Sequence, residues 1–327
     1  MPENHTPADT NVTDHDATAT TTARPASQAE AKPAGKSGAK RKKKPAKRAA
    51  KKPPLTAKTA DRHALYQEAV QNVESEIDFV DKTFKKLRGR HAERLREDFC
   101  GTGNTSCEFV RRRSTNHAFG LDIDEPTLRW GRDNCVAPLK DHQQERVHLI
   151  NRDVREPEDA TEMDVVLAMN FSYWLFQERR AMVDYFRSVH ASLKDDGVLF
   201  TDFYGGTEAG TEVEEERSCK LDGRKFTYIW DQNKYNAITG EMNCFIHFKF
   251  PDGTKMKKAF SYTWRLWGLP EMQDVLRDAG FSNVTVYWEG DEKDENGELT
   301  GEGNGIFRPT RRAENCESFI CYIVAEK

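Results

Sequence analysis

Residues 95–122 read LREDFCGTGNTSCEFVRRRSTNHAFGLD, and their pattern decides the fold. It predicts a strand, a glycine turn, a helix and a second strand that closes on Asp122. The turn from Cys100 to Gly103 lets the backbone approach a ligand closely, because glycine has no Cβ. The helix that begins near Asn104 directs free N–H groups at the same place, and Asp122 arrives beside it as an acceptor for two ribose hydroxyls. The stretch therefore predicts a site for a nucleotide-like ligand.

The glycine spacing distinguishes two kinds of nucleotide-like ligand. A dinucleotide site uses G-x-G-x-x-G, in which the third glycine lets helix and strand pack closely. Here Gly101 and Gly103 are followed by Asn-Thr-Ser at 104–106, so the third glycine is missing. The acidic Glu97 just before the turn also suits a cationic ligand better than a pyrophosphate. S-adenosylmethionine is such a ligand, because it carries a sulfonium and an amino group together with ribose and adenine.

The segment resembles motif I of the class I S-adenosylmethionine-dependent methyltransferases, commonly written hD-h-G-C-G-T-G. Glu97 stands at the acidic position and the four residues 100–103 match in order, whereas Phe99 replaces the usual first glycine. A lone G-x-G also fits an ordinary tight turn, but the flanking strand and helix and the acid at Asp122 make this pattern more specific. The resemblance covers about residues 62–327.

Strands and helices alternate after one long predicted helix, 62–88. The predicted strands are Arg94–Phe99, His117–Asp122, Val147–Asn151, Asp164–Met169 and Val198–Phe203. Alternation of this kind predicts a doubly wound α/β fold, with helices on both faces of a mostly parallel sheet. We expect seven strands in all, because a helix (Pro270–Ala279), a strand (Asn283–Trp288), an acidic loop (289–305) and a last strand (Ser318–Ala325) match the reversed hairpin of the class I sheet.

Residues 204–267 interrupt the alternation. Strand-like runs are separated there by Asp-Gly or Thr-Gly turn signals, which predict an antiparallel meander inserted after the fifth strand. The runs are Lys225–Trp230, Met242–Phe250 and Lys255–Trp264. In related small-molecule enzymes this region covers the acceptor, so we expect a lid that confers acceptor choice.

The resemblance implies eight cofactor-binding residues. Asp122 would hold the ribose, Asp153 the adenine amino group and Asn170 the amino-acid end, while Glu97 would mainly order the turn. The full set is Glu97, Cys100, Gly101, Thr102, Gly103, Asp122, Asp153 and Asn170. They fall at or near the carboxyl ends of predicted strands, where such folds bind ligands. A helix cap at Asp122 and a surface acid at Asp153 are the alternatives.

Three residues are candidates for the acceptor side and for catalysis: Tyr173, Tyr262 and Arg265. Tyr173 lies in the run after the fourth strand, and an arginine can bind an acceptor carboxylate or phosphate with two hydrogen bonds. The alternatives are aromatic packing under the next helix, which we expect for Trp174 and Phe176, and a surface salt bridge for Arg265. His247 is expected to be structural. Trp288–Glu289 and Asn304–Arg308 are further candidates for the pocket.

The net charge of −4 conceals two opposite segments. Residues 1–60 hold 13 Lys and Arg against 5 Asp and Glu, for a net +8. Few residues there could build a core, so we expect a disordered basic tail before a catalytic domain at 61–327. The run at 32–58 resembles the lysine-alanine-proline tails of histone-like proteins. It predicts nonspecific contact with nucleic acid or another polyanion, with a merely solubilising tail as the alternative.

Seven cysteines are scattered without a C-x-x-C pair, at positions 100, 107, 135, 219, 244, 316 and 321. This pattern favours a reducing cytoplasm and predicts neither a disulfide framework nor a metal site. Nucleoid or nuclear association through the basic tail is an alternative location. No apolar run is long enough for a membrane span, so no membrane partner is expected. The sequence gives no oligomeric state.

Together these features predict methyl transfer from S-adenosylmethionine to a nucleophile. The sulfonium is already a good leaving group, so the protein mainly aligns the reactants and excludes water. We expect a small-molecule acceptor. The alternatives are an RNA or protein methyltransferase that docks through its basic tail, and a non-catalytic polyanion-binding protein.

Overall fold

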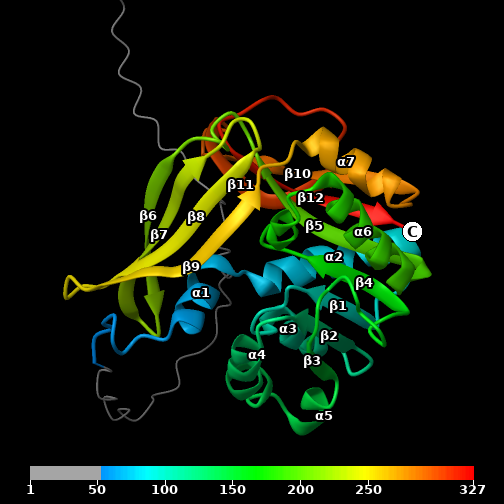
Figure 1. Ribbon diagram of the computed structural model, residues 1–327, viewed down its shortest axis with the longest axis horizontal. Coiled ribbons are helices and arrows are strands. Elements are labelled where there is room, and N and C mark those ends of the chain that lie inside the picture. Colours follow the sequence, from blue (N-terminus) through cyan, green and yellow to red (C-terminus); the bar gives the residue numbers. More distant parts are fainter. Residues whose placement is uncertain (1–52) are drawn as a thin grey trace, which may run out of the picture.

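The computed structural model describes residues 53–327 (Figure 1). Most of the expected basic tail, including 32–52 of the expected polyanion-contact run, lies outside the described residues. The expected tail boundary at residue 60 is wrong, because the chain already packs on the protein by Leu55, which is 2% exposed. The Ala57 N–H also donates to Thr254 Oγ1 at 3.0 Å.

The central sheet has the mostly parallel, doubly wound arrangement that the sequence predicts. Its order is β11-β10-β12-β5-β4-β1-β2-β3, and β12 runs antiparallel between β5 and β10. The strands are β1 (Arg94–Asp98), β2 (His117–Asp122), β3 (Val147–Asn151), β4 (Met163–Ala168), β5 (Leu193–Gly205), β10 (Asn283–Lys293), β11 (Leu299–Pro309) and β12 (Phe319–Glu326). The chain reverses its direction of travel across the sheet between β1 and β4, which is where such folds open a ligand crevice.

An eighth strand corrects the sequence expectation of seven. The predicted loop 289–305 is the hairpin of β10 and β11, with Asp291 opposite Gly303 and bulges on either side. The strand is an edge strand, and Leu299 is 62% exposed. Because β11 is rich in glycine, it has no alternation of apolar side chains from which a strand could be predicted.

Helices cover both faces of the sheet (Figure 1). The α-helices of the described residues are α1 (Arg62–Val70), α2 (Val73–Arg88), α3 (Asn104–Arg112), α4 (Glu125–Gly131), α5 (Asp141–Gln144), α6 (Arg179–Ser192) and α7 (Leu269–Asp278). The single helix expected at 62–88 is broken, because Gln71 is extended and Asn72 caps α2 with its side chain. Within the described part of the chain, no helix has the length and apolar character to cross a membrane.

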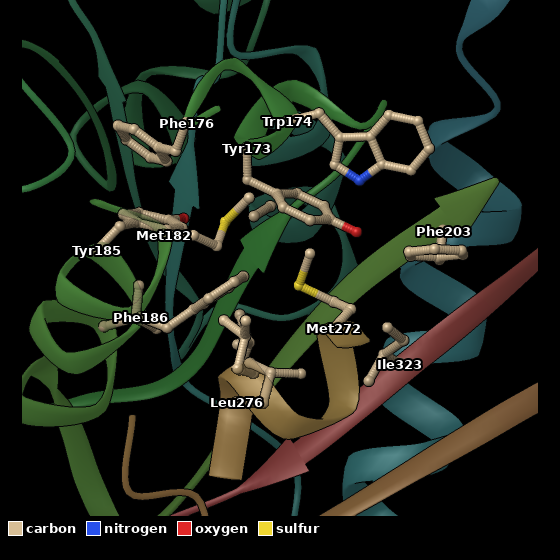
Figure 2. Packing of buried hydrophobic residues seen from close by; sticks show 14 of the residues in the cluster. Tyr173, Trp174, Phe176, Met182, Tyr185, Phe186, Phe203, Met272, Leu276 and Ile323 are labelled. Atoms are coloured by element: carbon tan, nitrogen blue, oxygen red, sulfur yellow. The ribbon is translucent and has the colours of Figure 1, made fainter. Parts of the chain in front are cut away.

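The two faces of the sheet bury separate cores. Along β5, Val198 and Phe200 belong to the core under α2 and α3, whereas Leu199 and Phe203 belong to the core under α6 and α7. Figure 2 shows the second core, to which α6 contributes Phe186, α7 contributes Met272 and β5 contributes Phe203. Each fully buried apolar side chain contributes about 1.5–3 kcal/mol, so β5 anchors both layers.

The insertion after β5 forms its own antiparallel sheet, which we call the lid sheet. It consists of β6 (Val213–Leu221), β7 (Arg224–Tyr235), β8 (Glu241–Lys249) and β9 (Lys255–Arg265), in that order. The expected meander is confirmed, but β6 was missed because its sequence VEEERSCKL is rich in charge. The lid sheet stands beside the central sheet with α1 against it (Figure 1). Leu65 and Ala69 of α1 pack there with Phe226 and Phe248.

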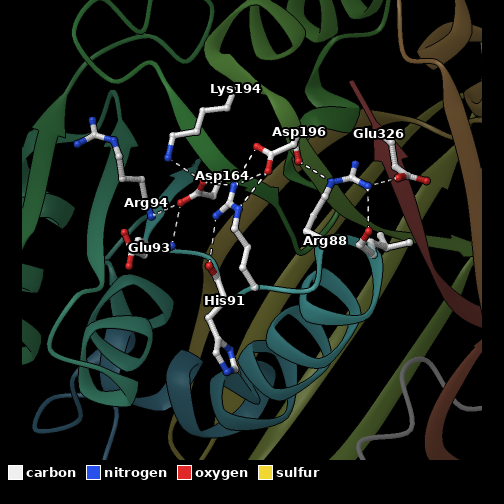
Figure 3. Close-up of polar contacts among 10 residues, drawn as sticks. Arg88, His91, Glu93, Arg94, Asp164, Lys194, Asp196 and Glu326 are labelled. Carbon is white, nitrogen blue, oxygen red and sulfur yellow. Dashed lines mark hydrogen bonds and ion pairs between the residues drawn. The ribbon is translucent and has the colours of Figure 1, made fainter.

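A buried carboxylate ties the base of β4 to β1 and β5 (Figure 3). Asp164 accepts the backbone N–H groups of Glu93 at 2.8 Å and Arg94 at 2.9 Å. Its other oxygen accepts Arg90 Nη2 and Lys194 Nζ, both at 2.8 Å. Burial alone would raise the pKa of Asp164, but these hydrogen bonds outweigh it and hold the pKa below its ordinary value.

Asp164→Ala should lower the free energy of unfolding by about 3–5 kcal/mol, because it strands two backbone donors and two cations. Urea denaturation at neutral pH measures this loss. The matched control is Asp196→Ala, because Asp196 also pairs with Arg90 but its side chain is 46% exposed, and it should cost less than about 1 kcal/mol. Equal losses in the two variants would contradict a special role for Asp164.

Candidate functional site

The glycine turn lies at the carboxyl end of β1 and has a left-handed backbone. Phe99, Gly101 and Gly103 have φ values of 56°, 54° and 67°. Phe99, where relatives have glycine, therefore keeps the glycine conformation at a cost of about 1–2 kcal/mol. Its ring lies 5.7 Å from Tyr185 and 6.1 Å from Phe176, and this packing offsets the cost.

Glu97 orders the turn from below, as expected. Its Oε2 accepts both the backbone N–H and the hydroxyl of Ser106, at 2.8 and 2.6 Å. These bonds satisfy donors in the first turn of α3. Burial raises the pKa of Glu97 to about 7. The turn is held by this carboxyl, so its glycine backbone is left to face a ligand.

Asp122 reaches the same turn from β2. Its Oδ2 accepts the Gly101 N–H at 2.8 Å and its Oδ1 accepts the Asp124 N–H at 2.9 Å. Burial raises the pKa of Asp122. Each oxygen keeps a further lone pair, so the carboxylate can still accept two hydroxyl groups, as ribose requires.

A cleft of about 490 Å³ opens beside the turn, and we call it the glycine-turn cleft. Seven of the eight predicted cofactor residues line it: Glu97, Cys100, Gly101, Thr102, Asp122, Asp153 and Asn170. Gly103 does not. It begins α3 and packs on β3, where a Cβ would lie 2.5 Å from Leu149 Cδ2.

Two exposed apolar residues complete the cleft and were missed from the sequence. Ile123 is 75% exposed and Leu175 is 45% exposed, and both line the glycine-turn cleft. Large apolar side chains left in solvent at a cleft mark a ligand surface. They supply flat apolar walls beside Asp122, so the site fits a ligand with a ribose and an aromatic base. The position of Ile123 directly after the ribose acid was the available signal.

Asp153 lies at the cleft, but its carboxylate is already paired. Arg155 donates to it from Nε at 3.0 Å and from Nη2 at 2.6 Å. These hydrogen bonds hold the pKa of Asp153 below its ordinary value. The predicted contact with an amino group therefore has to form beside this pair or in its place.

Asp202 of β5 was missed from the sequence, and it fixes the chain after β4. Its carboxylate accepts the N–H groups of Asn170 at 2.7 Å and Phe171 at 3.0 Å. Both of these residues are left-handed, with φ of 57° and 55°. Burial raises the pKa of Asp202 to about 7. A single acid at the end of a hydrophobic strand gave no motif from which this role could be predicted.

A second cavity, of about 220 Å³, lies between the lid sheet and the central sheet. We call it the aromatic cavity. Its walls include Tyr66, Phe171, Trp174, Trp230, Tyr262 and Trp264. Tyr66, Asn170, Tyr262 and Trp264 also line the glycine-turn cleft. The two spaces are therefore adjacent and share walls. Glu289, Gly305 and Phe307 line the aromatic cavity too, which confirms part of the expectation for Trp288–Glu289 and Asn304–Arg308.

The prediction that Tyr173 faces the acceptor is wrong. Its side chain is fully buried in the core under α6 (Figure 2), and its hydroxyl donates to the Asp202 carbonyl at 2.7 Å. The short helical turn η2 (Ser172–Leu175) points the ring inward. The neighbouring Trp174, expected only to pack, lines the aromatic cavity instead.

Arg265 also differs from its predicted role as an acceptor ligand. It donates to the Gln177 carbonyl at 3.1 Å and to Glu271 Oε1 at 2.9 Å. Its guanidinium lies 3.8 Å from the centre of the Trp267 ring. Every strong partner of Arg265 is thus protein, and the residue fastens the end of the lid sheet to α7. Tyr262, by contrast, lies where expected.

Among the described residues, one cluster has the side chains for a metal ion, namely Glu214, Asp231 and His247. The His247 Nδ1 accepts the Lys258 N–H at 2.7 Å. The proton therefore sits on Nε2, which lies 3.1 Å from Asp231 Oδ2 and donates to it. No ring lone pair is left for a metal, so the Asp–His pair is structural within the lid sheet, as expected for His247.

Comparison with known proteins agrees with this geometry. Residues 100–199 match the family model described as a methyltransferase domain. None of the curated proteins matches the chain in sequence.

Solved structures share the fold at low identity. An S-adenosylmethionine-dependent methyltransferase from Clostridium acetobutylicum is 13% identical with a TM-score of 0.57, covering 81% of this chain and 96% of its own. The amino pentose methyltransferase CalS10 from Micromonospora echinaspora is 18% identical with a TM-score of 0.57, covering 81% and 95%. The sugar N-methyltransferase KedS8 from a Streptoalloteichus species is 14% identical with a TM-score of 0.55, covering 86% and 97%.

Residues 100–199 match a methyltransferase domain, and the glycine-turn site stands in the fold of the class I S-adenosylmethionine-dependent methyltransferases. The cofactor that these residues fit is S-adenosylmethionine, which would supply a methyl group activated by a positive sulfur. Asp122, the glycine turn and the apolar wall at Ile123 are the residues that would hold it. The work left to the other residues is to bind the acceptor, orient it and exclude water.

Asp122→Ala should weaken binding of S-adenosylhomocysteine by about 10–100-fold, or about 1–3 kcal/mol, because it removes the carboxylate placed for the ribose. Titration calorimetry on the full chain measures the Kd. Asp133→Ala, an exposed acid on the same side of the sheet, should leave the Kd unchanged. Tight NAD binding without any heat from S-adenosylhomocysteine would contradict the cofactor assignment.

The buried Asp202 should give a distinctive pH dependence of stability. The folded pKa of Asp202, about 7, lies above the ordinary value of 3.8. Its contribution to the free energy of unfolding is therefore fully present below about pH 4 and is lost as the pH rises through 7. The stability of the wild type minus that of Asp202→Asn should therefore fall between pH 5 and pH 8. Denaturation series across this range test the sign, and a difference that rises with pH would refute it.

Proposed function

We propose that the enzyme methylates a small molecule enclosed in the aromatic cavity. The observation that carries this proposal is the shared wall, because a molecule in the aromatic cavity lies directly behind Asn170 and Tyr262 of the glycine-turn cleft. Largely aromatic pockets with a few polar groups are typical of small-molecule sites.

The similar structures support the same substrate class. By their names, one acts on an amino pentose and another on a sugar nitrogen. At 18% and 14% identity they share the fold with this chain, and their acceptors serve as a guide for choosing substrates to test.

Labelled methyl transfer tests the proposal directly. The full chain is incubated with S-adenosylmethionine labelled in the methyl group and with pooled metabolites, cellular RNA or cellular protein. Label in the metabolite fraction is the expected result. Label confined to RNA or protein would favour the alternative of docking through the basic segment, and no label in any fraction would favour a non-catalytic protein.

Trp230→Ala should separate acceptor recognition from cofactor binding, because Trp230 lines only the aromatic cavity. We expect kcat/KM for the acceptor to fall at least tenfold, or about 1.4 kcal/mol, with the Kd of S-adenosylhomocysteine nearly unchanged. Trp288→Ala is the matched control, since this ring packs on Phe319 at 4.4 Å and lines neither space. Equal losses of cofactor binding and activity in Trp230→Ala would place the tryptophan in the core or the cofactor site.

A further inference from the structure

Charged side chains in the aromatic cavity are mostly acidic. Three carboxyl groups line it from three different elements: Glu76 of α2, Asp202 of β5 and Glu289 of β10. Arg217 of β6 is the one lining cation among the residues described. It is held elsewhere, because its Nη2 donates to the Ala69 carbonyl and its guanidinium lies 5.2 Å from the Tyr228 ring centre. The cavity is therefore short of positive charge.

The three carboxyl groups of the cavity are weaker acids than they would be in water. Burial raises the pKa of Glu76 and of Asp202 to about 7, and it raises the pKa of Glu289 as well. The charge of Asp202 further raises the pKa of Glu76. An opposite charge placed nearby favours the ionised forms. These carboxyl groups therefore favour a cationic ligand, which would stabilise their ionised forms.

Aromatic ring faces and unpartnered polar atoms complete the site. Tyr262 stacks on Trp264 at 4.5 Å, and Trp230 lies 6.2 Å from Trp264, so the lid sheet presents a panel of rings to a cation. The Nε1 of Trp174 and the Oε1 of Gln232 have no hydrogen-bond partner, although these side chains are only 1% and 4% exposed. Both residues line the cavity, where they offer one donor and one acceptor.

We propose that the aromatic cavity binds the methyl acceptor as the ammonium form of a small hydroxylated aliphatic amine. The proposal rests on the small-molecule function above. The carboxyl groups and ring faces hold the ammonium, while the Trp174 indole and the Gln232 carbonyl meet hydroxyl groups. Arg217 brings one positive charge to the same lining, and its Nε has no hydrogen-bond partner, so the three carboxyl groups outnumber the lining cation by two.

This acceptor has a consistent chemistry. The ammonium gives one proton to a cavity carboxylate, and the freed lone pair on nitrogen forms a bond to the methyl carbon. The bond from that carbon to sulfur breaks, and its electron pair stays on sulfur, which becomes neutral. The product is a methylammonium and the carboxyl group carries the displaced proton, so charge and atoms balance.

Binding of three matched probes tests the proposal without methyl transfer. The probes are trans-4-aminocyclohexanol, cyclohexane-1,4-diol and 4-hydroxycyclohexanecarboxylate, titrated by calorimetry at neutral pH into the full chain saturated with S-adenosylhomocysteine. The amine should bind at least about tenfold more tightly than the diol, and the carboxylate should bind most weakly.

Two variants test whether the cavity carboxyl groups cause the preference for the amine over the diol. Glu76→Gln and Glu289→Gln should each reduce the ratio of amine to diol affinity by at least about fivefold, with melting temperatures confirming that they fold. Glu74→Gln, on the same helix as Glu76 but exposed and outside the cavity, should leave the ratio unchanged. Equal or tighter binding of the diol or the carboxylate would overturn the ammonium proposal while leaving small-molecule methylation intact. Failure of all three probes to bind would overturn it as well.

Discussion

The carboxylate of Asp202 accepts two consecutive backbone N–H groups, and this contact shapes the centre of the protein. Asn170 and Phe171 would each lose about 1–2 kcal/mol in a left-handed conformation, while each hydrogen bond to Asp202 avoids the cost of about 1–3 kcal/mol for a buried N–H without a partner. The balance favours the bent chain as long as Asp202 is present. The bend directs Asn170 to both ligand spaces and turns Tyr173 inward to the core. The wall between the two spaces therefore depends on one side chain of β5.

Acidic groups recur around this wall and act in different ways. Glu97 holds the start of α3, Asp122 holds the glycine turn, and Asp202 holds the bend after β4. In each case backbone N–H groups stabilise a buried carboxylate, which would otherwise be costly to leave in a place of low polarity. Each of these acids also lies at the carboxyl end of a strand. The parallel sheet thus gathers them at one edge although they are far apart in the sequence.

The sequence was sufficient for the parts of the fold that repeat a strong local pattern. Motif I from Glu97 to Gly103 and the acid at Asp122 predicted the cleft, because strand, turn and helix follow one another without a gap. The edge strands β6 and β11 escaped, because β6 is rich in charge and β11 is rich in glycine, so neither carries a clear apolar alternation. Arg265 and Tyr173 were misplaced for another reason. Their roles depend on partners such as Glu271 and the Asp202 carbonyl, which only the folded chain brings near.

The rings shared by the glycine-turn cleft and the aromatic cavity have a thermodynamic consequence. Tyr66 comes from α1, whereas Tyr262 and Trp264 come from the lid sheet, and all three border both spaces. A ligand that fixes these rings in one space removes their freedom before the other ligand arrives. The second ligand then loses less conformational entropy on binding. By linkage, the increase in affinity is the same whichever ligand binds first. With the acceptor in the aromatic cavity, cooperative binding of cofactor and acceptor is therefore expected through the common wall, without a large movement of the lid sheet.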